Sequence, residues 1–175
     1  MAWGPQERHG RKATQPCPCG YQGHPRVPCR CPPSIVQRYR RRIGGPLLER
    51  IELRVEMLPP SFEELIPARR STRRATPGLG GTELREQVEA ARARQLARQG
   101  ARKNAELDGT ELDRWSPLEG EGRQLCARAA RVRSLSARAL QALRRVARTL
   151  ADLEGEEHVQ PKHLAQALAL RSPAV

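Results

Sequence analysis

The segment QPCPCGYQGHPRVPCRCPPS, residues 15–34, places the strongest limit on what this chain can fold into. It holds four of the five cysteines, arranged as two Cys-x-Cys pairs, Cys17/Cys19 and Cys29/Cys31, among closely spaced prolines. Proline lacks the backbone N–H that a helix needs, and it biases the residue before it towards extended geometry. We therefore expect a rigid loop that carries four thiols.

Three uses of these thiols fit the loop: a metal site, unliganded thiols, and a redox or disulfide role. Zinc held by four thiolates needs Zn–S distances of about 2.3 Å, which puts the sulfurs about 3.7 Å apart. An extended Cys-x-Cys pair spans about 6.5–7 Å between its Cα atoms, so the prolines and Gly20 would have to bend each pair into a clip. His24 lies inside the loop and is an alternative ligand or a solvated loop residue.

The expected cellular location bears on this choice. The first residues contain no apolar stretch typical of a secretory signal, and no run of about 18 apolar residues predicts a membrane span. We therefore expect a reducing, cytoplasmic location, which favours a metal site over structural disulfides. The fifth cysteine, Cys126, falls in a helical pattern and is predicted to be a small buried hydrophobic residue.

Composition limits the core and suggests a partner. Only five residues are aromatic, so the core must be built from Leu, Val, Ile and Ala, which suits small helical layers. The net charge is +13, and nearly all 32 basic residues are arginine. Arginine binds phosphate bidentately, so one explanation is a polyanion such as nucleic acid or nucleotide; the other is a coding bias that gives a solvated basic surface.

The densest basic cluster is QRYRRRIGG, residues 37–45. Tyr39 could stack on a base and the neighbouring arginines could line a DNA channel; alternatively, the cluster is a solvated helix face. The DNA-binding candidates are therefore Arg38, Tyr39, Arg40, Arg41 and Arg42.

Three regions separate by composition. Residues 1–45 are basic and rich in proline. In RIELRVEML, within residues 46–66, apolar and charged residues alternate with period two, which predicts a strand with one buried face. Residues 67–81 lack periodicity and predict a flexible linker, or a basic arm that touches DNA.

From residue 82 onward the pattern is helical. One helix is expected over 82–99 with Gly100 as its C-terminal cap, and its apolar stripe runs through Leu84 and Val88 to Ala91 and Gln95/Leu96.

Three further helices are expected after that. SPLE, residues 116–119, reads as a capping box that opens a second helix, which settles after Gly122. A third, strongly periodic helix runs from the Ser136 cap to Gly155, and a short fourth begins at Pro161. Four amphipathic helices predict a small helical domain.

Three segments in this order, PCPCGYQGHP…CRC, RYRRRIGGPLLERIEL and LSARALQALRRVARTLADLEG, resemble the C-terminal half of the magnesium-chelatase-like AAA+ ATPases of the ComM/YifB group. The resemblance covers about residues 15–171. It implies a mainly α chain: a remnant of the AAA+ α/β core over 1–66, with the Cys-rich loop and one or two strands, then a four-helix lid over 82–175. It also implies ATP and magnesium as cofactors, a homohexameric ring, and DNA remodelling of the branch-migration type that serves natural transformation.

The resemblance also implies roles for three residues. Arg50, in LLERIEL, matches the arginine finger that reaches a neighbouring subunit's ATP. The residues alone instead favour an ordinary arginine at a strand entrance. Arg138, in LSARAL, matches the sensor-2 arginine, in the first turn of a helix where a bound phosphate would offset the unfavourable dipole. Gln15 stands where the family has the sensor-1 asparagine, and its amide lies one methylene further out.

The chain departs from the family upstream. No G-x-x-x-x-G-K-[ST] phosphate loop and no aliphatic strand ending in acidic metal ligands occur in it, and QERHGRKAT is too polar for a central strand. We therefore expect no ATP hydrolysis by this chain alone, and a truncated product or one whose first residues come from a shifted reading frame. The alternatives are an autonomous zinc-stapled nucleic-acid-binding protein and a non-functional gene remnant.

Overall fold

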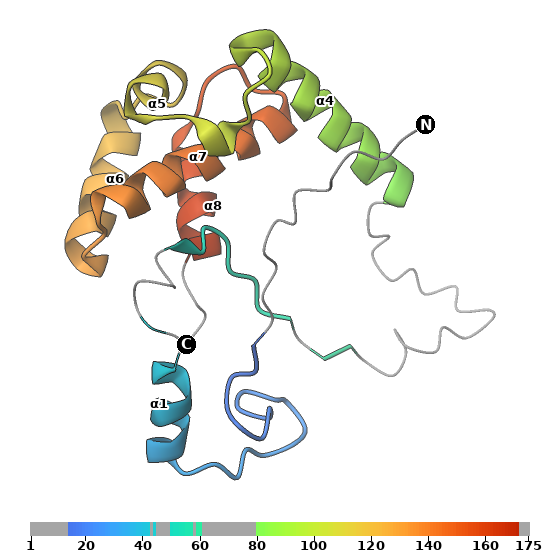
Figure 1. The fold of residues 1–175 in the computed structure, drawn as a ribbon, viewed down its shortest axis with the longest axis vertical. Coiled ribbons are helices and arrows are strands. Elements are labelled where there is room, and N and C mark those ends of the chain that lie inside the picture. The colour runs from blue at the N-terminus through green and yellow to red at the C-terminus, as the bar shows by residue number, and fades with distance from the viewer. Residues whose placement is uncertain (1–13, 43, 45–49, 58, 61–79, 172–175) are drawn as a thin grey trace. The chain divides into compact units, whose positions relative to one another are not determined.

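The computed structural model describes residues 14–42, 44, 50–57, 59–60 and 80–171. The chain divides into two compact units, Met1–Leu48 and Glu49–Val175. Within the described residues there are six α-helices, one 3₁₀ turn and no strand. Figure 1 labels the helices. The predicted mainly helical fold is confirmed, and no described helix is long and apolar enough to cross a membrane.

The described part of the first unit consists of the Cys-rich loop and helix α1, Pro33–Arg41. The helix opens on a proline, which is tolerated at the first helical position because its missing N–H has no intrahelical partner there. Val36 is 6% exposed and Cys17 is fully buried, so these two side chains form most of the unit's small interior. Arg40 links the helix to the loop: its guanidinium donates to the Pro16 carbonyl (3.4 Å) and to the Gln22 side-chain oxygen (3.3 Å).

The strand predicted over RIELRVEML is wrong for the described residues 51–57, which have no regular secondary structure. Leu53, Val55 and Met57 are 52, 68 and 85% exposed, so the predicted buried face is uncovered. An alternating segment becomes a strand only when a neighbouring strand pairs with it, and the described part of the chain offers none. The segment instead contacts the helical unit, where the Arg54 N–H donates to the Leu170 carbonyl (2.7 Å). The predicted linker, 67–81, lies almost wholly outside the described residues.

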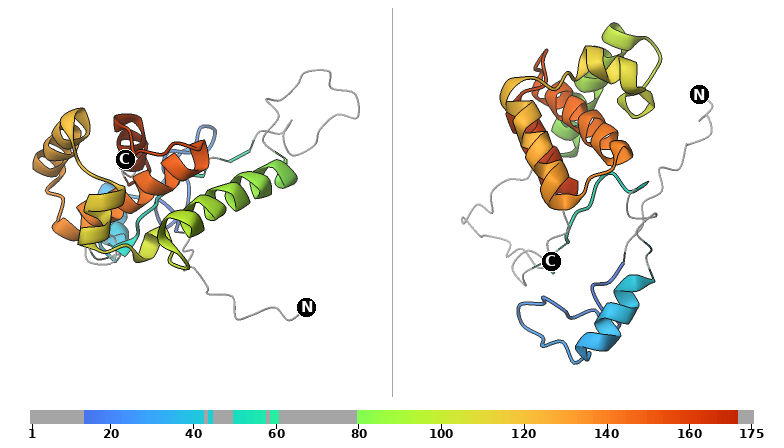
Figure 2. Two further views of the ribbon diagram at one scale, coloured as in Figure 1. Left: turned by 90° about the horizontal axis from the view of Figure 1, so that it is seen from above. Right: turned by 90° about the vertical axis from the view of Figure 1, so that its left-hand side faces the viewer.

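The second unit is a helical domain built around one central helix. Helix α7 packs against α4, the 3₁₀ turn η1, α5 and α8, and α6 packs against α8; Figure 2 shows this arrangement from two further sides. The elements are α4 (Gly81–Gln99), η1 (Asn104–Glu106), α5 (Gly109–Trp115), α6 (Gly120–Arg133), α7 (Ala137–Glu154) and α8 (Pro161–Arg171).

The hydrophobic core lies between α6, α7 and α8. Its buried members are Cys126, Leu143, Ala147, Leu164, Ala167 and Leu168. The helices approach closely because Gly122 has no side chain: a Cβ there would lie 2.8 Å from a Leu164 methyl carbon. Cys126 is the buried hydrophobic residue that its position predicts, and burial raises the pKa of its thiol.

The caps of α7 follow the prediction. The Ser136 hydroxyl accepts a hydrogen bond from the Ala139 N–H (3.2 Å), and Gly155 closes the helix in the left-handed region at φ 79°. Gly100 also closes α4 at a positive φ of 67°, and Pro161 is the first residue of α8.

The predicted capping box at 116–119 is wrong. Ser116 ends α5 instead of opening α6, and it is fully buried. Its hydroxyl donates to the Arg144 carbonyl (3.3 Å), while its own carbonyl accepts from the Arg144 guanidinium (2.9 Å). Helix α6 begins at Gly120 without a side-chain cap. A tertiary contact with α7 therefore takes the hydroxyl that a local cap would have used.

Helix α5 was not predicted. It is only seven residues long, and a capping box opens it: the Glu111 N–H donates to the Asp108 carboxylate (2.9 Å), and the Asp108 N–H donates to the Glu111 carboxylate (3.0 Å). This Asp-x-x-Glu pattern is the sequence signal that could have revealed the helix.

Helix α4 is buried along part of its predicted stripe. Ala91 and Gln95 are buried against the domain, but Leu84, Val88 and Leu96 are 47, 59 and 46% exposed. The N-terminal half of the helix extends past the other helices of the domain, as Figure 2 shows, so no other described helix covers the first part of its stripe.

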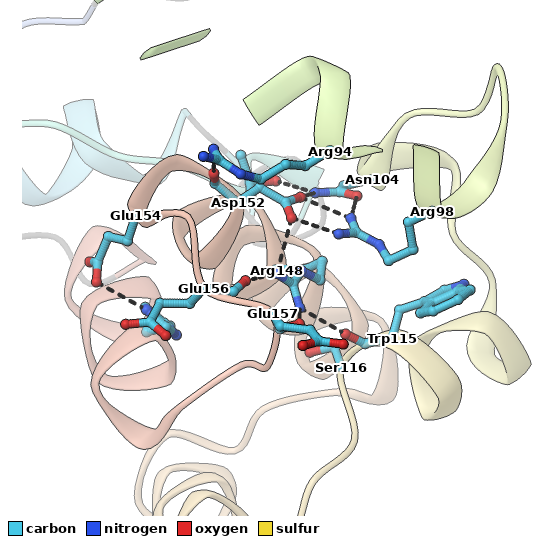
Figure 3. A network of polar contacts seen from close by, with 12 residues as sticks. Arg94, Arg98, Asn104, Trp115, Ser116, Arg148, Asp152, Glu154, Glu156 and Glu157 are labelled. Atoms are coloured by element: carbon cyan, nitrogen blue, oxygen red, sulfur yellow. Dashed lines mark hydrogen bonds and ion pairs between the residues drawn. The ribbon is translucent and has the colours of Figure 1, made fainter. Parts of the chain in front are cut away.

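One buried carboxylate joins three elements of this domain. Asp152, on α7, is fully buried, and it accepts hydrogen bonds from Arg98 (2.6 and 2.9 Å), Arg148 (3.0 Å) and Asn104 (2.8 Å). Figure 3 shows these donors around it, together with Arg94, which donates to the Asp152 backbone carbonyl (2.7 Å). Burial raises the pKa of Asp152, but its charged and amide donors outweigh burial, so the pKa is lowered overall.

We predict that Asp152→Asn destabilises the domain by about 3–5 kcal/mol, because it leaves buried arginines without their counter-charge. The control is Asp113→Asn: Asp113 also pairs with an arginine, Arg144 (2.8 Å), but its side chain is 76% exposed, so the cost should be at most about 1 kcal/mol. Urea unfolding followed by circular dichroism measures both variants. Equal losses in the two would contradict the prediction.

The same carboxylate predicts a pH dependence. Because the folded pKa of Asp152 lies below its unfolded value, its contribution is present above the unfolded pKa and is lost as the pH falls through the folded pKa. The wild type should therefore lose more stability on acidification than Asp152→Asn, measured by urea unfolding across the acid range.

Candidate metal centre

The four thiols of the Cys-rich loop converge. The Cys17 sulfur lies 3.4 Å from that of Cys19 and 3.6 Å from that of Cys29, and Cys19 and Cys29 are also 3.6 Å apart. With Cys31, all four sulfurs lie within 4.8 Å of one another. Tetrahedral zinc coordination places thiolate sulfurs about 3.7 Å apart, so this cluster could hold one metal ion.

Local backbone turns bring the pairs together. After Cys-Pro-Cys, the Gly20 N–H donates to the Cys17 carbonyl (3.0 Å), and Gly20 takes φ 81°, which a side chain would make costly. In the second pair the Cys31 N–H donates to the Cys29 sulfur (3.4 Å). These turns supply the bend that an extended Cys-x-Cys pair lacks.

The thiols differ in acidity. The backbone N–H groups of Tyr21 and Arg30 stabilise the Cys19 thiolate and lower the pKa of Cys19 to about 6. At Cys29 the N–H of Cys31 favours the thiolate, but burial and the neighbouring thiols outweigh it and raise the pKa to about 12. Four adjacent thiols cannot all ionise without a positive charge between them, and a bound cation supplies that charge.

His24 is not part of this cluster. Its Nδ1 accepts hydrogen bonds from the N–H groups of Arg26 (3.1 Å) and Val27 (3.0 Å), and its ring meets Tyr21 edge-on. The histidine therefore holds a turn inside the loop, a role that sequence reasoning did not assign.

The basic cluster predicted to bind DNA lies on and just after α1. Arg38, Arg41 and Arg42 are exposed, and Tyr39 is partly buried. Arg40 differs from its neighbours because it binds the Cys-rich loop, a tie that the sequence pattern gave no signal for.

The three residues matched to nucleotide-handling roles are all exposed. Gln15 lies next to the metal-site loop, with its side-chain oxygen against Gly20. Arg138 is the second residue of α7, where it was predicted, and Arg50 precedes the extended segment. Gln15 belongs to the first unit, and Arg50 and Arg138 belong to the second. The four cysteines are the candidate residues that the structure brings together.

Comparison with known protein families shows the family to which the chain belongs. Residues 11–65 match the family model described as magnesium chelatase, subunit ChlI, and residues 79–171 match the model of the ChlI C-terminal region. The chain belongs to the magnesium chelatase ChlI family. The resemblance seen in the sequence is thus confirmed, and the second match coincides with the helical domain.

Several relatives in this family align with 91% of the chain. It is 34% identical over 161 residues to the uncharacterized protein YifB of Escherichia coli, and 32% identical over 161 residues to the competence protein ComM of Haemophilus influenzae. It is also 34% identical over 166 residues to the uncharacterized protein Rv2897c of Mycobacterium tuberculosis. The chain spans about 30% of the length of these curated relatives.

We predict that this ChlI-family chain binds one Co²⁺ or Zn²⁺ ion, because four thiolates complete a tetrahedral shell. Titration with Co²⁺ should develop the visible absorption bands of a tetrahedral thiolate site and saturate at one ion per chain. Cys17→Ser combined with Cys29→Ser should abolish the bands, whereas Cys126→Ser, in the core of the other unit, should leave them unchanged. Bands that persist in the double variant would place the metal elsewhere.

Proposed function

We propose that this chain acts as the C-terminal portion of an ATP-dependent AAA+ machine that remodels DNA, and that its Cys-rich loop binds zinc. The observation that carries the proposal is the pair of consecutive ChlI-family matches, 11–65 and 79–171, in one chain whose first match contains the convergent thiols. The Haemophilus influenzae relative, a competence protein, supports a role in DNA handling.

The chain would act on nucleotide held by a partner. ATP with Mg²⁺ supplies phosphoryl-transfer chemistry when a phosphate-loop portion of the machine binds it. This chain offers Arg50 and Arg138, both exposed and thus free to reach towards an anion. At the start of α7, where no acidic residue lies in the first turn, a phosphate would be favoured by the helix N–H groups together with Arg138.

Zinc would have a structural role. Four thiolates fill its coordination shell, so the ion would have no open position for catalysis. The loop it holds is tied to α1 by Arg40, which would fix the exposed Arg38, Arg41 and Arg42 relative to the metal site. In this proposal the metal therefore holds the loop, the loop positions α1, and the arginines on and after α1 contact DNA.

A mixing experiment tests the ATPase role. The part of Escherichia coli YifB outside the aligned 161 residues, which under this proposal holds the nucleotide, is incubated with ATP and Mg²⁺, with and without this chain, and released phosphate is measured. We expect this chain to stimulate hydrolysis, and Arg50→Ala to lose most of the stimulation, since arginine fingers contribute about 10³–10⁵ in rate. Arg85→Ala, an exposed arginine on α4, is the control. Equal stimulation by Arg50→Ala would remove the arginine-finger assignment.

A binding experiment tests the DNA role. Replacing Arg38, Arg41 and Arg42 with Gln removes three phosphate contacts, so the slope of log K against log salt should fall by about 2–3. Binding of a fluorescein-labelled single strand is followed by anisotropy across a NaCl series.

A matched control variant loses the same charge elsewhere: Arg85→Gln, Arg102→Gln and Arg114→Gln, on and around α4 and α5. It should keep nearly the wild-type slope. A slope that falls equally in both variants would show that binding depends on net charge and not on α1.

A second candidate is an autonomous zinc-stapled nucleic-acid-binding protein. It is favoured by the completeness of the thiol cluster and α1 within one compact unit. DNA binding that depends on metal, together with no stimulation of ATP hydrolysis in the mixing experiment, would select this function.

A further inference from the structure

Charge is unevenly distributed along the helical domain. Residues 80–121 carry seven basic and nine acidic side chains, and residues 152–171 carry two basic and four acidic ones. The intervening residues 122–151, which form most of α6 and α7, carry eight arginines and no acidic residue. The acidic residues of α6 and α7 lie only near the outer ends of the hairpin, at Glu121, Asp152 and Glu154. A uniform coding bias towards arginine does not explain why none lies between them.

Half of these arginines have structural partners. On α7, Arg144 binds Asp113 and Arg148 binds Asp152, while Arg145 donates to the Leu107 carbonyl. A further arginine, at the end of α6, binds a backbone carbonyl of α8. These contacts stabilise the domain, but they do not account for the arginines on the solvent side of α6.

Three exposed arginines lie on that side of α6: Arg123, Arg128 and Arg131. At 3.6 residues per turn Arg128 and Arg131 project away from the buried face that carries Gly122 and Cys126, and Arg123 lies at the edge of the exposed side. A rise of about 1.5 Å per residue spreads them over about 12 Å along the helix axis. The helix dipole favours a cation near the C-terminus, as at Arg131, but it does not account for Arg123 in the first half of the helix.

We propose that these three residues form a polyanion-binding face on α6 that contacts the sugar–phosphate backbone of nucleic acid. A cluster of cations of one sign suits a chain of regularly spaced phosphates. The residues between them, Gln124 and Ala127, are uncharged, so no negative side chain interrupts the cluster. No aromatic residue lies on the helix to stack on a base, so the contact reads the backbone and not the sequence.

A membrane surface fits this face less well. Interfacial helices combine basic residues with large apolar ones that enter the lipid, and the exposed apolar side chain of α6 is the single β-branched Val132. The face belongs to the helical unit, whereas Arg38, Arg41 and Arg42 belong to the first unit. It rests on the proposed DNA role, but it needs no ATP hydrolysis.

The test uses the full chain and a face variant, Arg123→Gln, Arg128→Gln and Arg131→Gln, because glutamine keeps the side-chain length and helix propensity. Anisotropy with a fluorescein-labelled single strand of mixed sequence is measured across a NaCl series. The slope of log K against log salt should fall by about 2, since each lost phosphate contact removes about 0.7. Strands of different sequence should lose affinity equally, and the control variant that lacks Arg85, Arg102 and Arg114 should keep its slope.

Each other outcome contradicts the proposed face on α6. If the slope of the face variant is unchanged, α6 does not bind the strand, even if the α1 variant lowers the slope and the DNA role stands. Equal weakening of binding to polyglutamate shows general charge attraction, and weakened binding to phosphatidylserine vesicles with unchanged DNA binding assigns the face to a membrane. Circular dichroism and thermal unfolding establish that the variants fold; should the triple variant not fold, Arg128→Gln alone must lower the slope by about 0.7.

Discussion

The helical domain depends on one buried negative charge. Removing a carboxylate from water costs several kcal/mol unless charged donors surround it, and Asp152 receives them from α4, η1 and its own helix. These elements must therefore assemble together. Arg148 extends the network to the next connection by donating to the carbonyls of Glu156 (2.7 Å) and Glu157 (2.8 Å), which lead into α8. The position of α8, and of α6 packed on it, thus follows from the same charge.

In this domain arginine side chains connect the helices, a role that aromatic residues have in other small cores. With few aromatics available, guanidinium groups cross between helices, bury their carbon stems and end on carbonyls. Trp115 itself contacts Arg114 and Arg98, whose guanidinium carbons lie 4.4 and 5.9 Å from the ring centroid. The net charge of +13 consequently overstates the number of cations available to a partner. Only those that internal acids and carbonyls do not engage can recognise a polyanion.

The features that the sequence predicted well depend on local chemistry. Helix α7 has its cap, its apolar period and its terminal glycine in one continuous segment, and the Cys-rich loop is bent by its own prolines and Gly20. The failures depend on distant partners. Ser116 has a good local capping pattern, but Arg144, 28 positions away, takes its hydrogen bonds. The alternating segment 51–57 has the pattern of a strand without a described neighbour to pair with, and no local signal reveals whether such a neighbour exists.

The first unit is expected to need its metal site in order to fold. A loop and one nine-residue helix, with an interior of little more than Cys17 and Val36, bury too little apolar surface to offset the conformational entropy of ordering the chain. In such units a structural metal supplies folding free energy directly. The thiols that ionise least readily then gain most from the ion, because it removes the repulsion that keeps them protonated. Through Arg40, which ties the loop to α1, order created at the thiols would extend to the exposed arginines of the helix. The metal binding and the polyanion binding proposed for this unit are therefore expected to be coupled, although no residue takes part in both.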